Sequence, residues 1–440
     1  MAAFGIEHAA GRVRGLAGRV GPAGRSGMPR LVALLGGTTN LADCLVALHY
    51  LIDRREQVRG PVIAEYEREF ARTIGVRHAY SFSAGRVALY GLLRALNIGP
   101  GDEVLVQVPT HIVVPNAVRY TGARPVYVDC ELTTYNMDLR DAERRITPRT
   151  RALVLQHTFG NPADIGAVLE LTRRHGIELI EDCVHALGAR YDGRLLGSFG
   201  RAAFFSTEET KTISSTMGGM LVTDDAELAT RLRAFRAGCA WPSAALTTGY
   251  LLKLVLYHLL AEPHVHPYSR ALYNGVGRRH PLPKATSEVE FVGARPDDYE
   301  LRLSNAQANL ALRQLRRLES NVAHRRRVAE AYRVHLSRYG FATPETPSRG
   351  QAAFVRYPIR VARKQPVLNA VRPHAILGTW FDSVLEEAAS PTACGYEPGA
   401  CPQAEAATRH LVNLPTHPRI EERDVDAIVS ALVRAASPGA

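Results

Sequence analysis

Residues 203–223 read AFFSTEETKTISSTMGGMLVT, and this stretch decides the fold. The apolar runs at 203–206 and 220–223 are short and rich in β-forming residues, so they predict two buried strands. Between them lie Lys211 and a glycine pair that lets the backbone bend or approach a neighbour closely. A loop lysine is usually solvated surface. Here the buried strands on either side make Lys211 a candidate for chemistry.

Similar apolar runs occur upstream, at 104–108, 125–128, 152–156 and 177–180. Helical patterns separate most of these runs, as at 165–174. Strands that alternate with helices at this spacing predict an α/β fold with a mainly parallel sheet and helices on both faces.

The second half of the chain changes character. Residues 240–296 hold many Pro, His and Tyr residues without a strand pattern and predict a helical insertion. A long helix is expected over 303–336, followed by short strands and closing helices, which predict a smaller C-terminal α/β domain. The expected units are an N-terminal arm and helix at 1–58, a large domain at 59–239, the insertion at 240–296, and the connecting helix with the small domain at 297–440.

Composition sets limits on the class of protein. The chain has 440 residues, of which 46% are hydrophobic and 22% charged, so it has enough apolar residues for two or three domains and is not a disordered chain. The formal charge is +11 and only 7% of residues are aromatic, a poor composition for stacking on single-stranded nucleic acid. Six scattered cysteines without a CxxC pair are typical of reduced thiols in a cytoplasmic protein.

One apolar stretch raises the question of a membrane. Residues 250–260 read YLLKLVLYHLL, which is eleven residues long and includes Lys253 and His258. A bilayer span needs about 20 apolar residues, so a buried or interfacial helix is expected. Burial within the protein is the favoured reading, and contact of 246–268 with a partner or a membrane surface is the other one.

Strand ends indicate where a ligand binds, because open parallel sheets bind ligands at the carboxyl ends of their strands. Ser83, Gly85 and Arg86 lie at the start of a predicted helix, whose free N–H groups and dipole suit an anion, although an ordinary helix cap has the same pattern. Asp182 and His185 follow the strand at 177–180 and form either a ligand site or a structural pair.

Two further features were weighed for ligand binding. His111 follows the strand at 104–108, and its ring can stack on a planar ligand, though a surface histidine is the plainer reading. The pair His264 and His266 has no carboxylate or cysteine set near it in the sequence, so no metal site is expected.

Eight stretches together resemble the sugar aminotransferases of fold-type I, a family of pyridoxal-phosphate enzymes named after the DegT, DnrJ, EryC and StrS proteins. They occur in the family's order over roughly 60–235 and 297–436. The stretches are GPVIAEYEREFA, SAGRVALYGLLRALNIGPGDEVLV, NAVRYTGARPVYVD, ITPRTRALVLQHTFGNPAD, LIEDCVHALGA, FFSTEETKTISSTMGGMLVTDD, RLSNAQANLALRQL and AEAATRHLVNLPTHP.

The resemblance implies a seven-stranded type of sheet and a role for each site residue. Lys211 matches the lysine that forms the Schiff base with pyridoxal 5'-phosphate, and Asp182 matches the carboxylate that faces the ring nitrogen. His185 matches a position beside the ring, and His111 the stacking position. The cofactor phosphate is expected at Ser83, Gly85, Arg86 and Ser206, and substrate contacts at Glu208, Arg302 and His157.

The chain departs from the family pattern in three places. The loop PTHIVVPNA around His111 is two residues shorter than is usual in the family. Glu300 stands where the family commonly has an asparagine that reaches the neighbouring subunit's cofactor. The third departure is the long insertion at 240–296.

The expected function is that of a homodimeric, cytoplasmic aminotransferase with its active site at the subunit interface. The amino donor is expected to be glutamate or glutamine, and the acceptor a nucleotide-linked keto-sugar or a ketocyclitol, in secondary-metabolite or glycan biosynthesis. Three alternatives stay open: a dehydratase of the same family, a peripheral enzyme on a lipid-linked sugar, and a pyridoxal-phosphate-binding regulator. No nucleic-acid partner is expected.

Overall fold

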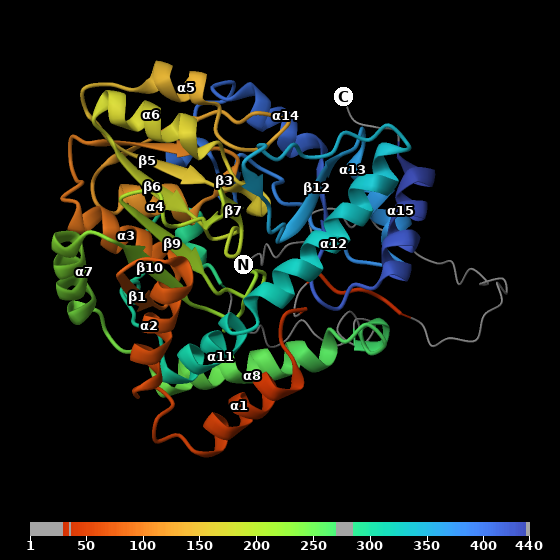
Figure 1. The fold of residues 1–440 in the computed structure, drawn as a ribbon, viewed down its shortest axis with the longest axis horizontal. Helices are drawn as coiled ribbons and strands as arrows, with labels where there is room; N and C mark the ends of the chain where they lie inside the picture. Colours follow the sequence, from red (N-terminus) through yellow and green to blue (C-terminus); the bar gives the residue numbers. More distant parts are fainter. Residues whose placement is uncertain (1–29, 35–36, 270–284, 437–440) are drawn as a thin grey trace.

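The computed structural model describes residues 30–34, 37–269 and 285–436. Its centre is a seven-stranded sheet in the order β1-β10-β9-β6-β5-β2-β4 (Figure 1). The strands are β1 (His78–Phe82), β2 (Glu103–Gln107), β4 (Arg124–Val128), β5 (Thr150–Gln156), β6 (Glu178–Asp182), β9 (Ala202–Ser206) and β10 (Gly219–Thr223).

The sheet is mainly parallel, as predicted. Strands β9, β6, β5, β2 and β4 run in one direction, and β10 is antiparallel to both of its neighbours. Gly219 pairs with Ser206, while Asp182 pairs with Gln156 on one side and Phe204 on the other. This register brings the carboxyl ends of β9 and β6 side by side at one edge of the sheet. The loop that follows Ser206 begins at this edge.

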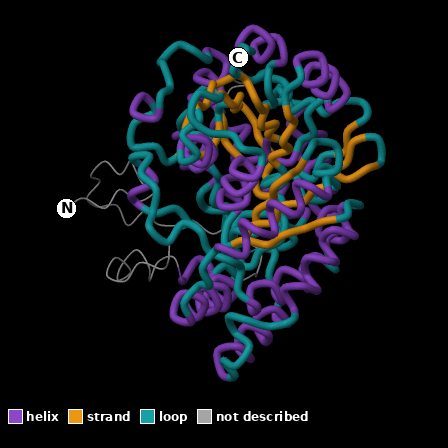
Figure 2. Tube along the Cα trace, turned by 90° about the vertical axis from the view of Figure 1, so that its left-hand side faces the viewer, coloured by secondary structure: helices purple, strands orange, loops and turns teal. Residues whose placement is uncertain are grey.

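Helices cover both faces of this sheet, and Figure 2 shows the strands gathered inside a shell of helices. One face packs against apolar side chains of α3 (Gly85–Ala95), α4 (Val113–Arg119) and α7 (Ala226–Gly238). The other face packs against a second set of helices, namely α2 (Val62–Ile74), α5 (Leu139–Arg145), α6 (Ile165–His175) and α11 (Asn305–Leu315).

The C-terminal part forms a smaller α/β unit. Antiparallel strands β12 (Arg356–Arg360) and β14 (Leu411–Pro415) share an apolar core with α12 (Leu318–Ser337), α13 (Lys364–Val371) and α15 (Glu422–Ala435). The domain limits set from the sequence stay predictions. The remaining elements are α14 (Pro402–His410), β3 (Thr110–His111), β13 (Leu385–Glu386), β7 (Arg190–Tyr191), β8 (Arg194–Leu195), β11 (Gly350–Gln351), α10 (Glu288–Phe291), η1 (Thr158–Gly160) and η2 (Thr392–Cys394).

The single long helix expected over 303–336 is two helices, so that expectation was wrong in detail. Helix α11 ends at Leu315 and α12 begins at Leu318. Arg317, at the break, leaves the helical conformation with ψ 9° and forms an ion pair of 2.7 Å with Asp43 of α1 (Leu41–Ile52). Leucine periodicity continues across the break, which is why the sequence pattern does not reveal it.

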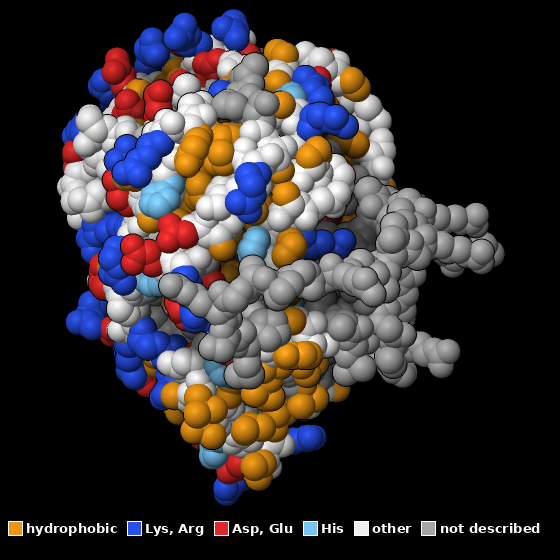
Figure 3. Space-filling view, turned by 90° about the vertical axis from the view of Figure 1, so that its right-hand side faces the viewer, with side chains coloured by type: hydrophobic (Ala, Val, Ile, Leu, Met, Phe, Trp, Pro, Cys, Tyr) orange, Lys and Arg blue, Asp and Glu red, His pale blue; other side chains and the backbone are white. Residues whose placement is uncertain are grey.

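The insertion contains one long helix, α8 (Ala244–Leu260), which packs against α1 and α11. Leu251 and Leu254 are buried, whereas Leu252 and Leu259 are more than half exposed. Figure 3 shows hydrophobic side chains gathered at the lower end of the molecule, where Figure 1 places α1 and α8. No described helix is long and apolar enough to cross a bilayer, and surface contact of 246–268 with lipid stays a prediction.

Candidate active site

Lys211 lies in the loop between β9 and β10; the residue is half-buried, and its amine lies among large- and small-domain residues. Its Nζ lies 4.3 Å from the centroid of the Trp380 ring. Burial lowers the pKa of Lys211 to about 8, with Arg356 acting in the same direction and Glu208 opposing it. An amine with such a pKa is neutral far more often near pH 7–8 than an ordinary lysine, so it can act as a nucleophile.

Asp182 ends strand β6 on the same edge of the sheet as the Lys211 loop. Its Oδ1 accepts a hydrogen bond of 3.1 Å from the Val184 N–H. Its Oδ2 is buried and has no hydrogen-bond partner in the described part of the chain. Burial raises the pKa of Asp182 to about 7, and the positive charge of Lys211 opposes this rise. A buried carboxylate oxygen without a partner is costly, which points to a cationic or protonated group that pairs with it.

His185 forms a flat surface beside this carboxylate. Its ring stacks on Trp380 with centroids 5.1 Å apart and lies parallel to the Phe159 ring at 6.3 Å. Burial and the nearby positive charges of Lys211 and Arg356 lower the pKa of His185, so the ring is neutral. Its Nδ1 is buried without a hydrogen-bond partner among the described residues.

The start of helix α3 borders the Lys211 loop. The N-cap residue is Ala84, so no side chain caps the first turn of the helix. A Cβ atom on Gly85 would lie 3.1 Å from the Phe205 carbonyl oxygen and 3.4 Å from the Ser206 Cβ, so glycine keeps the helix start close to β9. Uncapped N–H groups beside the Ser206 hydroxyl form a cradle for an anion.

The Arg86 side chain points away from this cradle. Its guanidinium pairs with the buried Glu290 at 2.9 Å and donates to the Ala285 carbonyl at 2.8 Å. Two residues of the insertion therefore bind the Arg86 guanidinium. The main-chain N–H of Arg86 is the group that is left to bind a phosphate. The predicted phosphate roles of Ser83, Gly85, Arg86 and Ser206 stay predictions.

Three other predicted residues, His157, Arg302 and His111, contact partners other than Lys211. His157 points toward Glu181, 3.4 Å away, while the neighbouring Asp182 is oriented to the other face of β6 because side chains alternate along a strand. Arg302 donates to main-chain carbonyls at the end of α7, and the structure does not bring it to Lys211. His111 Nε2 lies 3.1 Å from Glu387 Oε2, beside the pairing of β3 with β13 and near His185.

Glu208 does join the cluster, because its negative charge raises the pKa of Lys211. Its Oε2 accepts hydrogen bonds from the N–H and hydroxyl of Thr210. The roles predicted for Glu208, Arg302, His157 and His111 stay predictions.

Two site residues were missed at the level of sequence, and both come from the small domain. Trp380 contacts both Lys211 and Arg356, whose guanidinium carbon lies 3.7 Å from the indole centroid. Arg356 is buried, and its guanidinium has no hydrogen bond or ion pair to any described residue, although Glu208 and Glu386 lie close enough to act on its pKa. An arginine about 145 residues and a tryptophan about 170 residues beyond the lysine carry no local motif, so only the folded chain reveals them.

The residues present fit pyridoxal phosphate, which has a flat ring, a basic ring nitrogen, an aldehyde and a phosphate. Asp182 offers an unpartnered buried oxygen for the ring nitrogen, and His185 offers a neutral flat face. Lys211 offers an amine with a lowered pKa, and the start of α3 offers free N–H groups. Each chemical group of the cofactor therefore has a suitable partner.

Comparison with known proteins identifies the family of the chain. The model of the DegT/DnrJ/EryC1/StrS aminotransferase family matches residues 44–250 and 277–433. The chain belongs to this family. It is therefore a member of an aminotransferase family, and its fold is of the fold-type I kind.

Relatives within the family cover nearly the whole chain. The GDP-perosamine synthase of Caulobacter vibrioides is 32% identical over 391 residues, which is 85% of this chain and 90% of the relative. A dTDP-3-amino-3,4,6-trideoxy-alpha-D-glucose transaminase of Micromonospora megalomicea is 28% identical and covers 89% and 94% of the two chains. The crystal structure of S. venezuelae DesV superposes with a TM-score of 0.70 at 29% identity, covering 89% and 94%.

Proposed function

We propose that this chain binds pyridoxal phosphate and transfers an amino group from glutamate or glutamine to a nucleotide-linked keto-sugar. The observation that carries the proposal is the meeting of the buried amine of Lys211 with the unpartnered carboxylate oxygen of Asp182 at one sheet edge. Membership in the family supports it, as do relatives named for GDP- and dTDP-linked sugars. A ketocyclitol is the second acceptor class.

When bound, pyridoxal phosphate supplies an aldehyde that condenses with amines and a ring that accepts electrons from the substrate carbon. The amine of Lys211 would hold the cofactor, and when free it would act as the base that moves a proton of the substrate. Asp182 Oδ2 would pair with the ring nitrogen and keep it protonated. A positive nitrogen there would lower the pKa of Asp182 from its raised value, so the two groups would stabilise each other.

The surrounding residues position the reactants. His185 presents a neutral face, so it does not compete with Asp182 for the ring proton. The N–H groups at Gly85 and Arg86, together with the Ser206 hydroxyl, would hold the phosphate at the positive end of α3. Trp380 covers Lys211 and limits the access of water.

Arg356 is the residue that we assign to the donor carboxylate. It is buried close enough to Lys211 to lower the pKa of that amine, and it has no anionic partner within hydrogen-bonding distance in the described chain. A buried guanidinium is stabilised by a carboxylate that it can bind in a bidentate way. Lys211, Arg356 and Arg325 line one small cavity. Arg325 is buried, and its donors already bond Asn321, Val355 and Thr416.

We also infer a homodimeric, cytoplasmic enzyme of secondary-metabolite or glycan biosynthesis. Glu300 forms an ion pair with Arg295 in this chain. A carboxylate at this position does not suit a contact with a neighbouring subunit's phosphate, so that contact would need another residue.

The test is a two-step amino transfer with purified protein. Loading with pyridoxal phosphate should give a near-visible absorption band, glutamate should convert it to the pyridoxamine form, and a keto-sugar nucleotide should restore it. A panel of UDP-, GDP- and dTDP-linked keto-sugars and free ketocyclitols identifies the acceptor class. Release of water from the sugar without consumption of glutamate would favour the dehydratase instead.

A further inference from the structure

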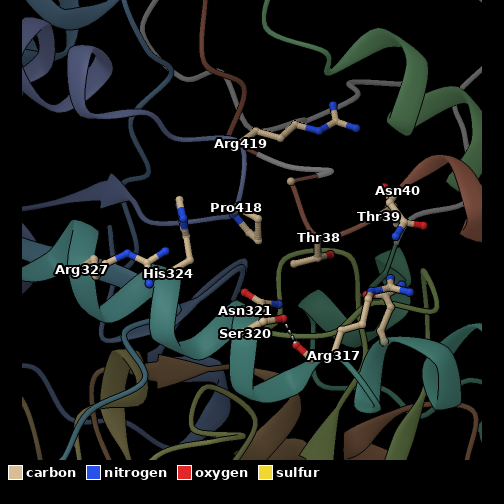
Figure 4. A pocket seen from close by; sticks show the side chains of 12 residues that line it. Thr38, Thr39, Asn40, Arg317, Ser320, Asn321, His324, Arg327, Pro418 and Arg419 are labelled. Atoms are coloured by element: carbon tan, nitrogen blue, oxygen red, sulfur yellow. Dashed lines mark hydrogen bonds between the residues drawn. The ribbon is translucent and has the colours of Figure 1, made fainter.

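A second cavity of about 380 Å³ lies on the side of residues 37–40 next to α12 (Figure 4). Its walls come from three parts of the chain: the N-terminal segment, the first half of α12, and the residues that follow β14. The volume falls in the range of small-molecule sites. The lining residues used below are Thr38, Asn321, His324, Arg327 and Arg419.

The cavity is cationic. Its twelve lining residues include three arginines and a histidine but no aspartate or glutamate. Arg317 is already paired with Asp43, at 2.7 Å. Arg327 is exposed and has no ion pair with any described residue. The balance of charge therefore favours an anionic ligand.

Two polar groups around this cavity, Thr38 Oγ1 and Arg419 Nη1, are buried and lack hydrogen-bond partners in the described part of the chain, and Arg419 Nη1 forms only a long ion pair of 3.7 Å with Glu262. His324 Nε2 is also buried, and the main-chain carbonyls of His417 and Ile420 lie near this ring. Buried polar groups in folded proteins nearly always have partners. Incompletely partnered groups around one cationic cavity indicate a ligand that accepts several hydrogen bonds, and phosphate oxygens are such acceptors.

The cavity is joined to the Lys211 loop. Gly37 and Thr38 line both this cavity and the smaller one that contains Lys211 and Arg356. Asn321, on its floor, donates a hydrogen bond of 2.6 Å to the carbonyl of Thr212, the residue after Lys211. A ligand held here therefore lies against the segment that carries the reactive amine.

We propose that this cavity binds the diphosphate of the nucleotide-linked acceptor and directs its sugar past Thr38 toward Lys211. The inference rests on the proposed function, because it assigns the charged part of that substrate to a place in the fold. Arg327 and Arg419 supply the charge, and Thr38 and His324 supply further hydrogen-bond donors.

The experiment measures binding of UDP, GDP, dTDP and inorganic phosphate to the cofactor-loaded enzyme by calorimetry. Arg327→Gln and Thr38→Val should each weaken binding of the preferred nucleoside diphosphate by about tenfold, because each removes a donor to a charged group. Arg333→Gln is the matched control, since it removes an exposed arginine further along α12, outside the cavity. It should bind like the wild type.

Kinetics separate this inference from the proposed function. In the cavity variants, KM for the nucleotide-linked acceptor should rise about tenfold while the reaction with the amino donor is unchanged. Equal nucleotide binding by wild type, Arg327→Gln and Thr38→Val would overturn the inference, even if amino transfer proceeds. Arg327-dependent binding of inorganic phosphate or nucleotide that does not compete with the acceptor would also overturn it, because the cavity would then be a separate anion site.

Discussion

The amine of Lys211 lies 4.3 Å from the centroid of the Trp380 ring. The same indole contacts Arg356 at 3.7 Å and stacks on His185 at 5.1 Å. Lys211 and His185 belong to the large domain, whereas Trp380 and Arg356 belong to the small one. The reactive amine therefore lies where the two domains meet. The low pKa of Lys211 depends on burial of its amine by residues of both domains.

The pH dependence of cofactor binding should report the lowered pKa of Lys211. Only the neutral amine attacks an aldehyde, so the association rate of pyridoxal phosphate should rise with pH and level off above about pH 8. Stopped-flow absorbance across pH 6–10 measures this association rate. Trp380→Ala should move the midpoint upward by exposing the amine, whereas a wild-type midpoint near that of free lysine would contradict the burial argument.

Asp182→Asn should separate stability from function. The pKa of Asp182 is raised, so this group stabilises the folded, cofactor-free protein below about pH 4, and that stability is lost as pH rises through about 7. At pH 8 the variant should be more stable than the wild type by about 2 kcal/mol in urea unfolding without cofactor. Its amino transfer should fall by several orders of magnitude, because the ring nitrogen loses its anionic partner.

The opposite result in either assay would count against the assignment. A variant that unfolds more easily than the wild type at pH 8 would mean that the buried carboxylate already has a stabilising partner in the cofactor-free protein. Near-normal turnover would mean that Asp182 does not face the ring nitrogen.

Arg356→Met should impair use of the amino donor. Removal of the buried guanidinium should raise KM for glutamate about tenfold or more, since a charge-assisted bidentate contact is lost. Steady-state kinetics with the donor and acceptor varied separately measure the effect, with the exposed Arg372→Met of the same domain as the control. A change confined to the acceptor KM would show that Arg356 serves another anion.

The buried pair of Lys253 and Glu209 joins the insertion to the Lys211 loop. Their side chains meet at 2.7 Å, and burial raises the pKa of Glu209 while Lys253 opposes the rise. Lys253→Met should destabilise the protein by about 3–4 kcal/mol, because the carboxylate stays buried without this partner. Adding Glu209→Gln should recover most of the loss.

Chemical denaturation of the single and double variants provides this cycle. Replacement of the exposed Arg333, which pairs with Glu330, should cost no more than about 0.5 kcal/mol and serves as the comparison. Equal losses for the Lys253 and Arg333 variants would show that the insertion is not tied to the site through this pair.

The sequence predicts well what depends on local pattern. The apolar runs locate β2, β4, β5, β6, β9 and β10 to within about two residues, because buried parallel strands are continuous and apolar. The Lys211 loop and the carboxylate of Asp182 follow two of these strands directly, so their meeting at one edge follows from sheet topology. The mainly parallel α/β fold was confirmed for the same reason.

Long-range placement is what the sequence does not reveal. Trp380 and Arg356 reach the site only after the small domain packs against the large one. Arg86 stands at a predicted phosphate-binding position, but its side chain pairs with Glu290, which is about 200 residues later in the sequence. The break between α11 and α12 is likewise set by contact of Arg317 with Asp43 of α1 rather than by a local signal.

The central claim is that Lys211 is the attachment point of the cofactor, with Asp182 opposite it. The most direct measurement is absorbance of the purified protein mixed with pyridoxal phosphate, followed by borohydride reduction, proteolysis and mass spectrometry. The account predicts a near-visible band in the wild type, none in Lys211→Ala, and a pyridoxyl group on the peptide that contains Lys211. An unchanged band in Lys211→Ala, or the label on another lysine, would contradict it.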